Sequence, residues 1–286
     1  MNRSMRPVDL HAHTNVSDGT LTPTELVQMA AKKELAAIAI TDHDTTAGVT
    51  EAMKEGERLG IRVIPGIEMS TKMEGCDIHL VGLFVDIHNE KLQEKLRQVL
   101  KDRNVRNYRS VDQLMEAGFD ISHEELASYG EERVLTRGNI AELLVKKGYA
   151  KDVKEAMNLY MRRGKVGYAK RVLPEPEECI KLLHDAGALV FVAHLHQIDG
   201  SDPEKCVRIC RAIIDMGADG LETRYCEFND RWREITEQIA EETGCLRSGG
   251  SDFHGSLKKN LELGTGYGDL LVPEYFLQEM EAHLSR

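Results

Sequence analysis

Short apolar runs alternate with segments of helical periodicity in the first and last thirds of the chain. The apolar runs cover residues 35–40, 61–65, 78–85 and 188–193, and a further short run precedes His11. A short strand is also expected at 220–222, and a glycine-rich strand at 246–251. Strands that are apolar at nearly every position are typical of parallel sheets with both faces covered. The pattern predicts an α/β fold of about seven strands, with a parallel sheet closed or covered by helices.

The segments between these runs carry helix signals. Thr22 and Glu25 form a capping box with Pro23 at the first helical position, which predicts a helix ending near Lys33. Further helices are expected at 49–59, where Gly60 provides the stop, and at 202–216, 230–243 and 273–284. Strand and helix therefore alternate as in barrels of parallel strands.

The alternation stops between about residues 89 and 177. This segment is polar and helical, with helices expected at 91–106, 108–117, 138–147 and 153–163 and a capping box at 122–125. We interpret it as a helical insertion (cap) subdomain, 89–177, in a barrel formed by 1–88 and 178–286. Such an insertion lies where α/β enzymes build substrate contacts, although a plain packing layer is the alternative.

Composition restricts the classes of function. The 286 residues are 41% hydrophobic and 30% charged, with no run long enough to span a bilayer and no apolar core of a secretory signal near the start. We therefore expect a cytoplasmic protein with no membrane partner and six reduced cysteines. The net charge of −11 argues against long nucleic acid but permits a small phosphorylated substrate. The sequence leaves the oligomeric state open.

Histidines and carboxylates gather at the ends of the predicted strands. His11 and His13 are two residues apart after the first apolar run, so an extended strand directs both rings to one face, and Asp18 follows in a turn. Other strand ends repeat this chemistry. The complete set of candidate ligands is His11, His13, Asp18, His43, Glu68, His79, His194, Asp252 and His254.

Nine ligands of this type exceed what one tetrahedral ion needs and suit two or three divalent ions. Imidazole and carboxylate without thiolate favour Mn²⁺, with Zn²⁺ or Fe²⁺ as alternatives. Closely spaced metal ions activate water and clamp the oxygens of a displacement reaction. Hydrolysis of phosphate esters is therefore the predicted chemistry.

The motifs HAH with a downstream Asp, TDHD, GIE, a later His, AH at a strand end and SDFH resemble the four motifs of the PHP (polymerase and histidinol phosphatase) family. Nearly the whole chain takes part in the resemblance, which is strongest to stand-alone bacterial enzymes with a helical insertion. It implies a distorted (β/α)7 TIM-like barrel. It also implies a phosphoesterase acting on small substrates such as nucleoside 3′,5′-bisphosphates or sugar phosphates.

The same resemblance implies how the ligands are shared. One ion would be bound by His11, His13, Glu68 and Asp252, and Glu68 would bridge to a second ion held by His79 and His194. Asp18, His43 and His254 would bind a third. A hydroxide bridging the ions would attack the phosphorus, and His43, His254 or Asp252 would relay protons.

Candidate phosphate contacts lie in and after the insertion. The family subgroup carries an Arg-x-His element there, which reads Arg137-Gly138-Asn139 in this chain, and an Arg after the AH strand end, where Gln197 stands. Arg137 is the main candidate. The additional candidates are Lys165, Lys170, Arg171 and His196.

Alternative functions use the same scaffold. A cyclic phosphodiesterase or an exonuclease acting on short oligonucleotides is the closest alternative. A histidinol phosphatase is a weaker alternative, because that branch of the family is not the best match for the insertion. A non-catalytic metal-binding domain is also weaker, since the ligand set is complete.

Overall fold

A computed structural model describes residues 6–129, 134–170 and 172–285. Seven strands form one sheet in the order β1-β2-β3-β4-β5-β6-β7. The strands are β1 (Val8–Asp9), β2 (Ala37–Ile40), β3 (Arg62–Met73), β4 (Cys76–Leu83), β5 (Leu189–Val192), β6 (Gly220–Tyr225) and β7 (Leu246–Gly250). The N–H of Leu10 donates to the carbonyl oxygen of Gly249 at 3.1 Å, which brings the first strand against the last. The barrel-like α/β fold expected from the sequence is confirmed.

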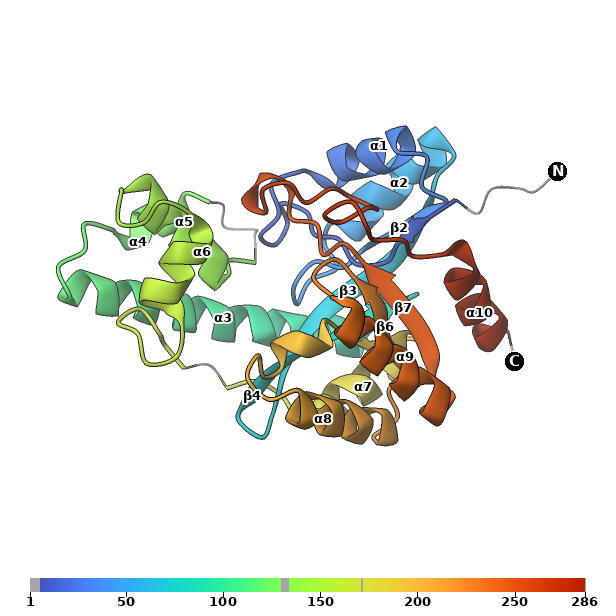
Figure 1. The fold of residues 1–286 in the computed structure, drawn as a ribbon. Helices are drawn as coiled ribbons and strands as arrows, with labels where there is room; N and C mark the ends of the chain where they lie inside the picture. The colour runs from blue at the N-terminus through green and yellow to red at the C-terminus, as the bar shows by residue number, and fades with distance from the viewer. Residues whose placement is uncertain (1–5, 130–133, 171, 286) are drawn as a thin grey trace.

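Helices cover the outside of this sheet (Figure 1). They are α1 (Pro23–Lys32), α2 (Val49–Leu59), α7 (Pro176–Asp185), α8 (Pro203–Asp215), α9 (Asp230–Thr243) and α10 (Glu274–Leu284). The capping box of Thr22 and Glu25 starts α1 as predicted. Gly60 ends α2 in the left-handed conformation, with φ of 69°, which glycine adopts without a steric penalty.

The apolar runs had suggested a parallel sheet, but the sheet is only partly parallel. Strand β4 is antiparallel to both β3 and β5, whereas the other neighbours are parallel. The reason lies in the connection between β3 and β4, which is only Glu74 and Gly75. Both have positive φ, 50° and 81°, as in the two-residue turns that match the twist of a hairpin. A connection this short forces the next strand to run back along β3.

The insertion projects to one side of the barrel (Figure 1). It contains α3 (Glu90–Glu116), α4 (His123–Ala127), α5 (Arg137–Lys146) and α6 (Val153–Ala156), which continues as a π-helical turn at Met157–Met161. The sequence had predicted two helices at 91–106 and 108–117, but they form the single helix α3. No glycine or proline breaks it, and the buried amide of Asn107 donates to the carbonyl oxygen of Leu135.

Two hydrophobic clusters lie on the two sides of the molecule. The larger one fills the barrel and includes Leu92 and Leu96 at the start of α3. The smaller one lies inside the insertion and includes Val111 and Leu114 from the end of the same helix. Two separate clusters are what a barrel and an insertion would have. The bounds of the two parts, 1–88 with 178–286 and 89–177, stay a prediction. Among the described residues, no helix is long and apolar enough to span a membrane, and all six cysteines are free thiols as expected.

Candidate metal centre

Backbone contacts hold the first motif of the chain against the last. Ala12 forms a parallel bridge with Phe253, and the N–H of His13 donates to the carbonyl oxygen of Phe253 at 2.9 Å. The N–H of Asp252 donates to the carbonyl oxygen of His11 at 2.8 Å. The positions of His11, His13 and Asp252 therefore follow from pairing of the segments that extend β1 and β7.

A second pair of motifs is joined in the same way. His43 and Glu68 form a parallel bridge beyond the end of β2. Next to it, the carboxylate of Asp42 accepts hydrogen bonds from the N–H and hydroxyl of Thr14 and from the hydroxyl of Ser17, at 2.6–2.8 Å. Asp42 therefore anchors the loop that carries Asp18 against the segment that carries His43.

The structure brings together all nine candidate ligands predicted from the sequence. Their nitrogen and oxygen atoms form four overlapping groups, each with ligand atoms within 4.8 Å of one another. The groups are His13, Asp18, His43 and His254; His11, His13 and Asp252; His11, Glu68 and His194; and His43, Glu68 and His79. Because the groups share members, the nine side chains form one continuous cluster.

Glu68 is the member that joins the groups. Its Oε1 lies 2.8 Å from both Nδ1 of His79 and Nε2 of His194, and its Oε2 lies 2.8 Å from Nδ1 of His43. The grouping pairs His194 with His11 and His79 with His43, whereas the family resemblance pairs His79 with His194. Both arrangements give Glu68 the bridging position.

His79 reaches the cluster because of the reversed direction of β4. The sequence placed it near the start of a strand, whereas the other candidate ligands follow strand ends. In an antiparallel strand the first half lies beside the last half of its neighbour, and His79 is in register with Ser70 near the end of β3. The hairpin thus carries His79 to the same end of the barrel as Glu68.

The donor set fits divalent cations. Within the described residues, the buried atoms Asp18 Oδ1, His43 Nδ1 and Glu68 Oε2 make no hydrogen bond of normal geometry, although His43 Nδ1 and Glu68 Oε2 lie 2.8 Å apart and Asp18 Oδ1 lies 3.3 Å from His254 Nε2. Burying such an atom without a partner costs about 1–3 kcal/mol. Imidazole nitrogens and carboxylate oxygens that converge without satisfying one another are the pattern that a bound metal ion resolves.

The protonation of the cluster shows its electrostatic strain. Burial alone would lower the pKa of His13, but contacts with Asp252 and Glu68 outweigh it and raise this pKa to about 9. Burial would raise the pKa values of Glu68, Asp18 and Asp252, yet the neighbouring histidines, and Lys258 beside Asp252, hold all three well below their usual range. The carboxylates are therefore ionised and attract positive charge, which protons supply when metal does not.

Several supporting residues were not predicted from the sequence. Glu222 in β6 is fully buried, and its Oε1 lies 2.7 Å from Nδ1 of His11. Tyr225, the last residue of β6, donates its hydroxyl to Asp252 Oδ2 at 2.7 Å. Lys258 Nζ lies 2.6 Å from the same oxygen. Groups of this kind orient metal ligands, but they follow no spacing that a sequence motif reveals.

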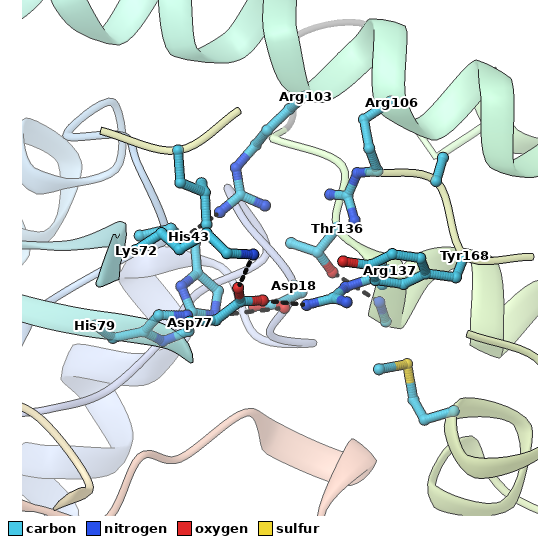
Figure 2. Close-up of a pocket in the computed structure, with 15 residues that line it drawn as sticks. Asp18, His43, Lys72, Asp77, His79, Arg103, Arg106, Thr136, Arg137 and Tyr168 are labelled. Carbon is cyan, nitrogen blue, oxygen red and sulfur yellow. Dashed lines mark hydrogen bonds and ion pairs between the residues drawn. The ribbon is translucent and has the colours of Figure 1, made fainter. Parts of the chain in front are cut away.

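Next to the cluster of candidate metal ligands, a cavity of about 200 Å³ opens between barrel and insertion (Figure 2). Asp18, His43 and His79 form part of its wall, so the cavity reaches the cluster directly. The cationic residues that line it are Lys72, Arg103, Arg106 and Arg137. Buried Arg103, on α3, donates from Nε to Asp44 Oδ2 at 2.7 Å and contacts the hydroxyl of Ser70.

The predicted phosphate contacts are distributed unevenly. Arg137 lines the cavity and lies over the ring of Tyr168, at 6.0 Å from its centroid. Lys165 and Lys170 are exposed and do not line it. Arg171 lies outside the described residues. His196 lies 3.2 Å from Glu227 and packs against Trp232 and Phe228, away from the cavity lining.

The two departures from the family subgroup have structural explanations. Asn139 is buried and accepts the N–H of Thr136 at 2.7 Å, which completes the capping box at the start of α5. Gln197 donates to the hydroxyl of Tyr225 at 3.0 Å and so supports the contact of Tyr225 with Asp252. Both side chains are engaged within the protein.

The site therefore combines a cluster of candidate metal ligands with a cationic cavity. Residues 9–188 match the family model of the PHP domain. The chain is 34% identical over 248 residues to the 5′-3′ exoribonuclease Rnm of Escherichia coli (strain K12), which covers 86% of this chain and 84% of that protein. It is 29% identical over 286 residues to the 3′,5′-nucleoside bisphosphate phosphatase of Chromobacterium violaceum, covering 99% of both.

A solved structure from Bifidobacterium adolescentis, described as a metal-dependent phosphoesterase, superposes with a TM-score of 0.88 at 30% identity, covering 97% of this chain and 96% of that one. The chain belongs to the PHP domain family. It is a metal-dependent hydrolase of phosphoester bonds, as the sequence predicted.

Proposed function

We propose that this protein removes a phosphate group from a small nucleotide that carries a second phosphate, such as a nucleoside 3′,5′-bisphosphate. The observation that supports this most directly is the continuity of the metal-ligand cluster with the cationic cavity. One wall offers His43 and His79, and the other offers Arg137. A substrate with phosphates at both ends fits that division.

Each part of the site has a role in this proposal. The nine clustered side chains hold the divalent ions, with Mn²⁺ preferred, and these ions supply an activated water and neutralise phosphate charge. Water adds to the phosphorus, the P–O bond to the ribose breaks, and the sugar oxygen leaves with a proton. His43, His254 and Asp252 are the groups that we expect to move protons. Arg137 binds the remote phosphate. Lys165, Lys170, Arg171 and His196 stay predicted substrate contacts, although Lys165, Lys170 and His196 lie outside the cavity lining.

A substrate panel tests the proposal. Protein loaded with Mn²⁺ should release phosphate from adenosine 3′,5′-bisphosphate faster than from either adenosine monophosphate, and metal analysis should find at least two ions per chain. No phosphate release from any member of a broad panel of esters would refute it. The cytoplasmic location is part of the proposal and is checked by cell fractionation.

A 5′–3′ exoribonuclease acting on short RNA is the second candidate. The insertion, 89–177, carries 18 lysines and arginines against 15 acids, whereas the rest of the chain carries 19 against 33. A positive excess confined to one side of the cavity favours a short polyanion there despite the acidic total charge. Release of mononucleotides from the 5′ end of a short RNA, at rates above those for the bisphosphate, would select this function.

A further inference from the structure

An acidic side chain lies between two cations inside the cationic cavity (Figure 2). Oδ1 of Asp77 is 3.3 Å from Nζ of Lys72, and Oδ2 of Asp77 is 3.5 Å from a terminal nitrogen of Arg137. Asp77 and Lys72 face each other across the β3–β4 hairpin, whereas Arg137 is the first residue of α5. The carboxylate therefore connects the barrel to the insertion at the point where we expect the second phosphate.

These contacts are open to exchange. The side chains of Lys72, Asp77 and Arg137 are 27%, 38% and 32% exposed, and both distances are long for ion pairs. Ion pairs this accessible add little to stability. A phosphate monoester carries more negative charge than a carboxylate and offers three acceptor oxygens, so it binds a guanidinium more strongly.

We propose that Asp77 is a specificity-determining residue that occupies the place of the substrate's second phosphate. A ligand with that phosphate displaces the carboxylate from Arg137 and Lys72. A ligand without it leaves the carboxylate where it is and gains nothing from the two cations. The inference rests on the proposed function and adds that Asp77 sets how tightly the remote phosphate is bound.

The test replaces Asp77 with its uncharged isostere. Asp77→Asn should lower the KM for adenosine 3′,5′-bisphosphate by about threefold to tenfold, because the competing charge is gone. Its kcat should not change, and the KM values for the two adenosine monophosphates should stay within error. Glu74→Gln is the matched control, since Glu74 lies on the same hairpin but pairs with Arg208 outside the cavity.

A binding measurement separates affinity from turnover. Calorimetric titration of adenosine 3′,5′-bisphosphate into protein without added metal should show a similar gain in affinity for Asp77→Asn over the wild type. In an Arg137→Gln background the gain should shrink, since one of the two contested cations is absent.

The outcomes are distinguishable. An unchanged or higher KM together with an unchanged or lower affinity for Asp77→Asn, with the wild type active on the bisphosphate, would overturn the role of Asp77. If the higher KM came with a lower melting temperature, Asp77 would be a structural link between barrel and insertion. A wild type that hydrolyses no bisphosphate would instead refute the proposed function, and the calorimetric comparison would still decide the role of Asp77.

Discussion

Oε1 of Glu222 lies 2.7 Å from Nδ1 of His11, and both side chains are fully buried. A carboxylate only accepts hydrogen bonds, so this contact places the ring proton on Nδ1 and leaves Nε2 of His11 to face the cluster. Glu222 also accepts the N–H of His194 through its other oxygen at 2.6 Å. One carboxylate therefore orients two of the predicted metal ligands.

We expect Glu222→Gln to weaken metal binding by about 10- to 100-fold, which is typical when the partner of a ligating histidine is changed. Calorimetric titration with Mn²⁺ measures this, and circular dichroism checks that the fold is retained. Glu262→Gln, which removes an exposed partner of Lys33, is the control for loss of one acidic charge. Equal metal affinity of the variant and the wild type would exclude the orienting role.

Glu68→Ala should have the largest effect on activity. Glu68 belongs to two of the four ligand groups, so its loss disturbs more than one ion at once. Turnover should fall by about three orders of magnitude or more, because activation of water by metal is the proposed chemistry. Metal analysis should show at least one ion fewer per chain. A variant that kept full metal content and activity would remove Glu68 from the centre.

The stability of the metal-free protein should depend on pH above neutrality. The pKa of His13 is raised from 6.5 to about 9, so the folded protein holds a proton there that the unfolded chain releases. The stabilisation is complete below pH 6.5 and is lost as the pH rises through 9, on the order of 3 kcal/mol for His13. Burial lowers the pKa values of His43 and His194. Their titration therefore changes the stability only below pH 6.5 and does not offset the loss at higher pH.

Denaturant unfolding at several pH values in the presence of a chelator measures this loss, and His13→Gln should flatten part of the slope. Metal binding should show the opposite trend, because the ion replaces the proton on His13. Affinity for Mn²⁺ should therefore rise with pH up to about 9, with proton release detectable in buffers of different ionisation enthalpy. A stability profile that is flat between pH 6.5 and 9 would contradict both expectations.

Arg137→Gln should raise the KM for a bisphosphate by about tenfold while kcat stays nearly constant, if Arg137 binds the remote phosphate. Steady-state kinetics with the bisphosphate and a monophosphate separate the two parameters. Arg97→Gln is the control, since Arg97 is an exposed residue of α3 that pairs with Glu94. A fall in kcat would place Arg137 at the reacting phosphate, and unchanged kinetics would remove it from the site.

The buried ion pair of Arg103 and Asp44 should be essential for stability. The side chains are 5% and 1% exposed, with nitrogen and oxygen 2.6 Å apart. Arg103→Met alone should lower the free energy of unfolding by about 3 kcal/mol, because Asp44 would keep its buried charge without this cation. The double variant with Asp44→Asn should recover most of the loss. Asn tolerates the positive φ of 52° at this position. Thermal or denaturant unfolding of the four proteins completes the cycle.

The metal-ligand cluster was predictable because its members follow strand-like runs, and the ends of parallel strands meet at one face. His11, His43 and His194 all obey this rule. His79 does not, since its position depends on a hairpin that the apolar pattern hides. The local sequence signal of that turn is the pair Glu74 and Gly75. Two-residue hairpin turns prefer Asn, Asp or Gly at positions of positive φ, so Glu74 does not mark a turn.

The roles of polar residues that are buried in the fold could not be predicted from the sequence. Arg103 is one of seven basic residues on α3, and nothing in its spacing distinguishes it from the exposed ones. Asn107 lies between the two helices that the sequence predicted, yet α3 runs through it, and its buried side-chain amide donates a hydrogen bond to the carbonyl oxygen of Leu135. Glu222 sits in a short strand without a motif. In each case the decisive partner is distant in sequence.

The continuity of α3 has a mechanical consequence. With 27 residues the helix is about 40 Å long. Leu92 near its start packs in the core of the barrel, and Leu114 near its end packs in the core of the insertion. Between them, Arg103 and Arg106 line the cavity. Because both ends of α3 are packed in a hydrophobic cluster, a tilt of the helix at one end also moves the other end. We therefore expect the width of the cavity and the position of the insertion to change together, so that a substitution at one end of α3 affects the other end.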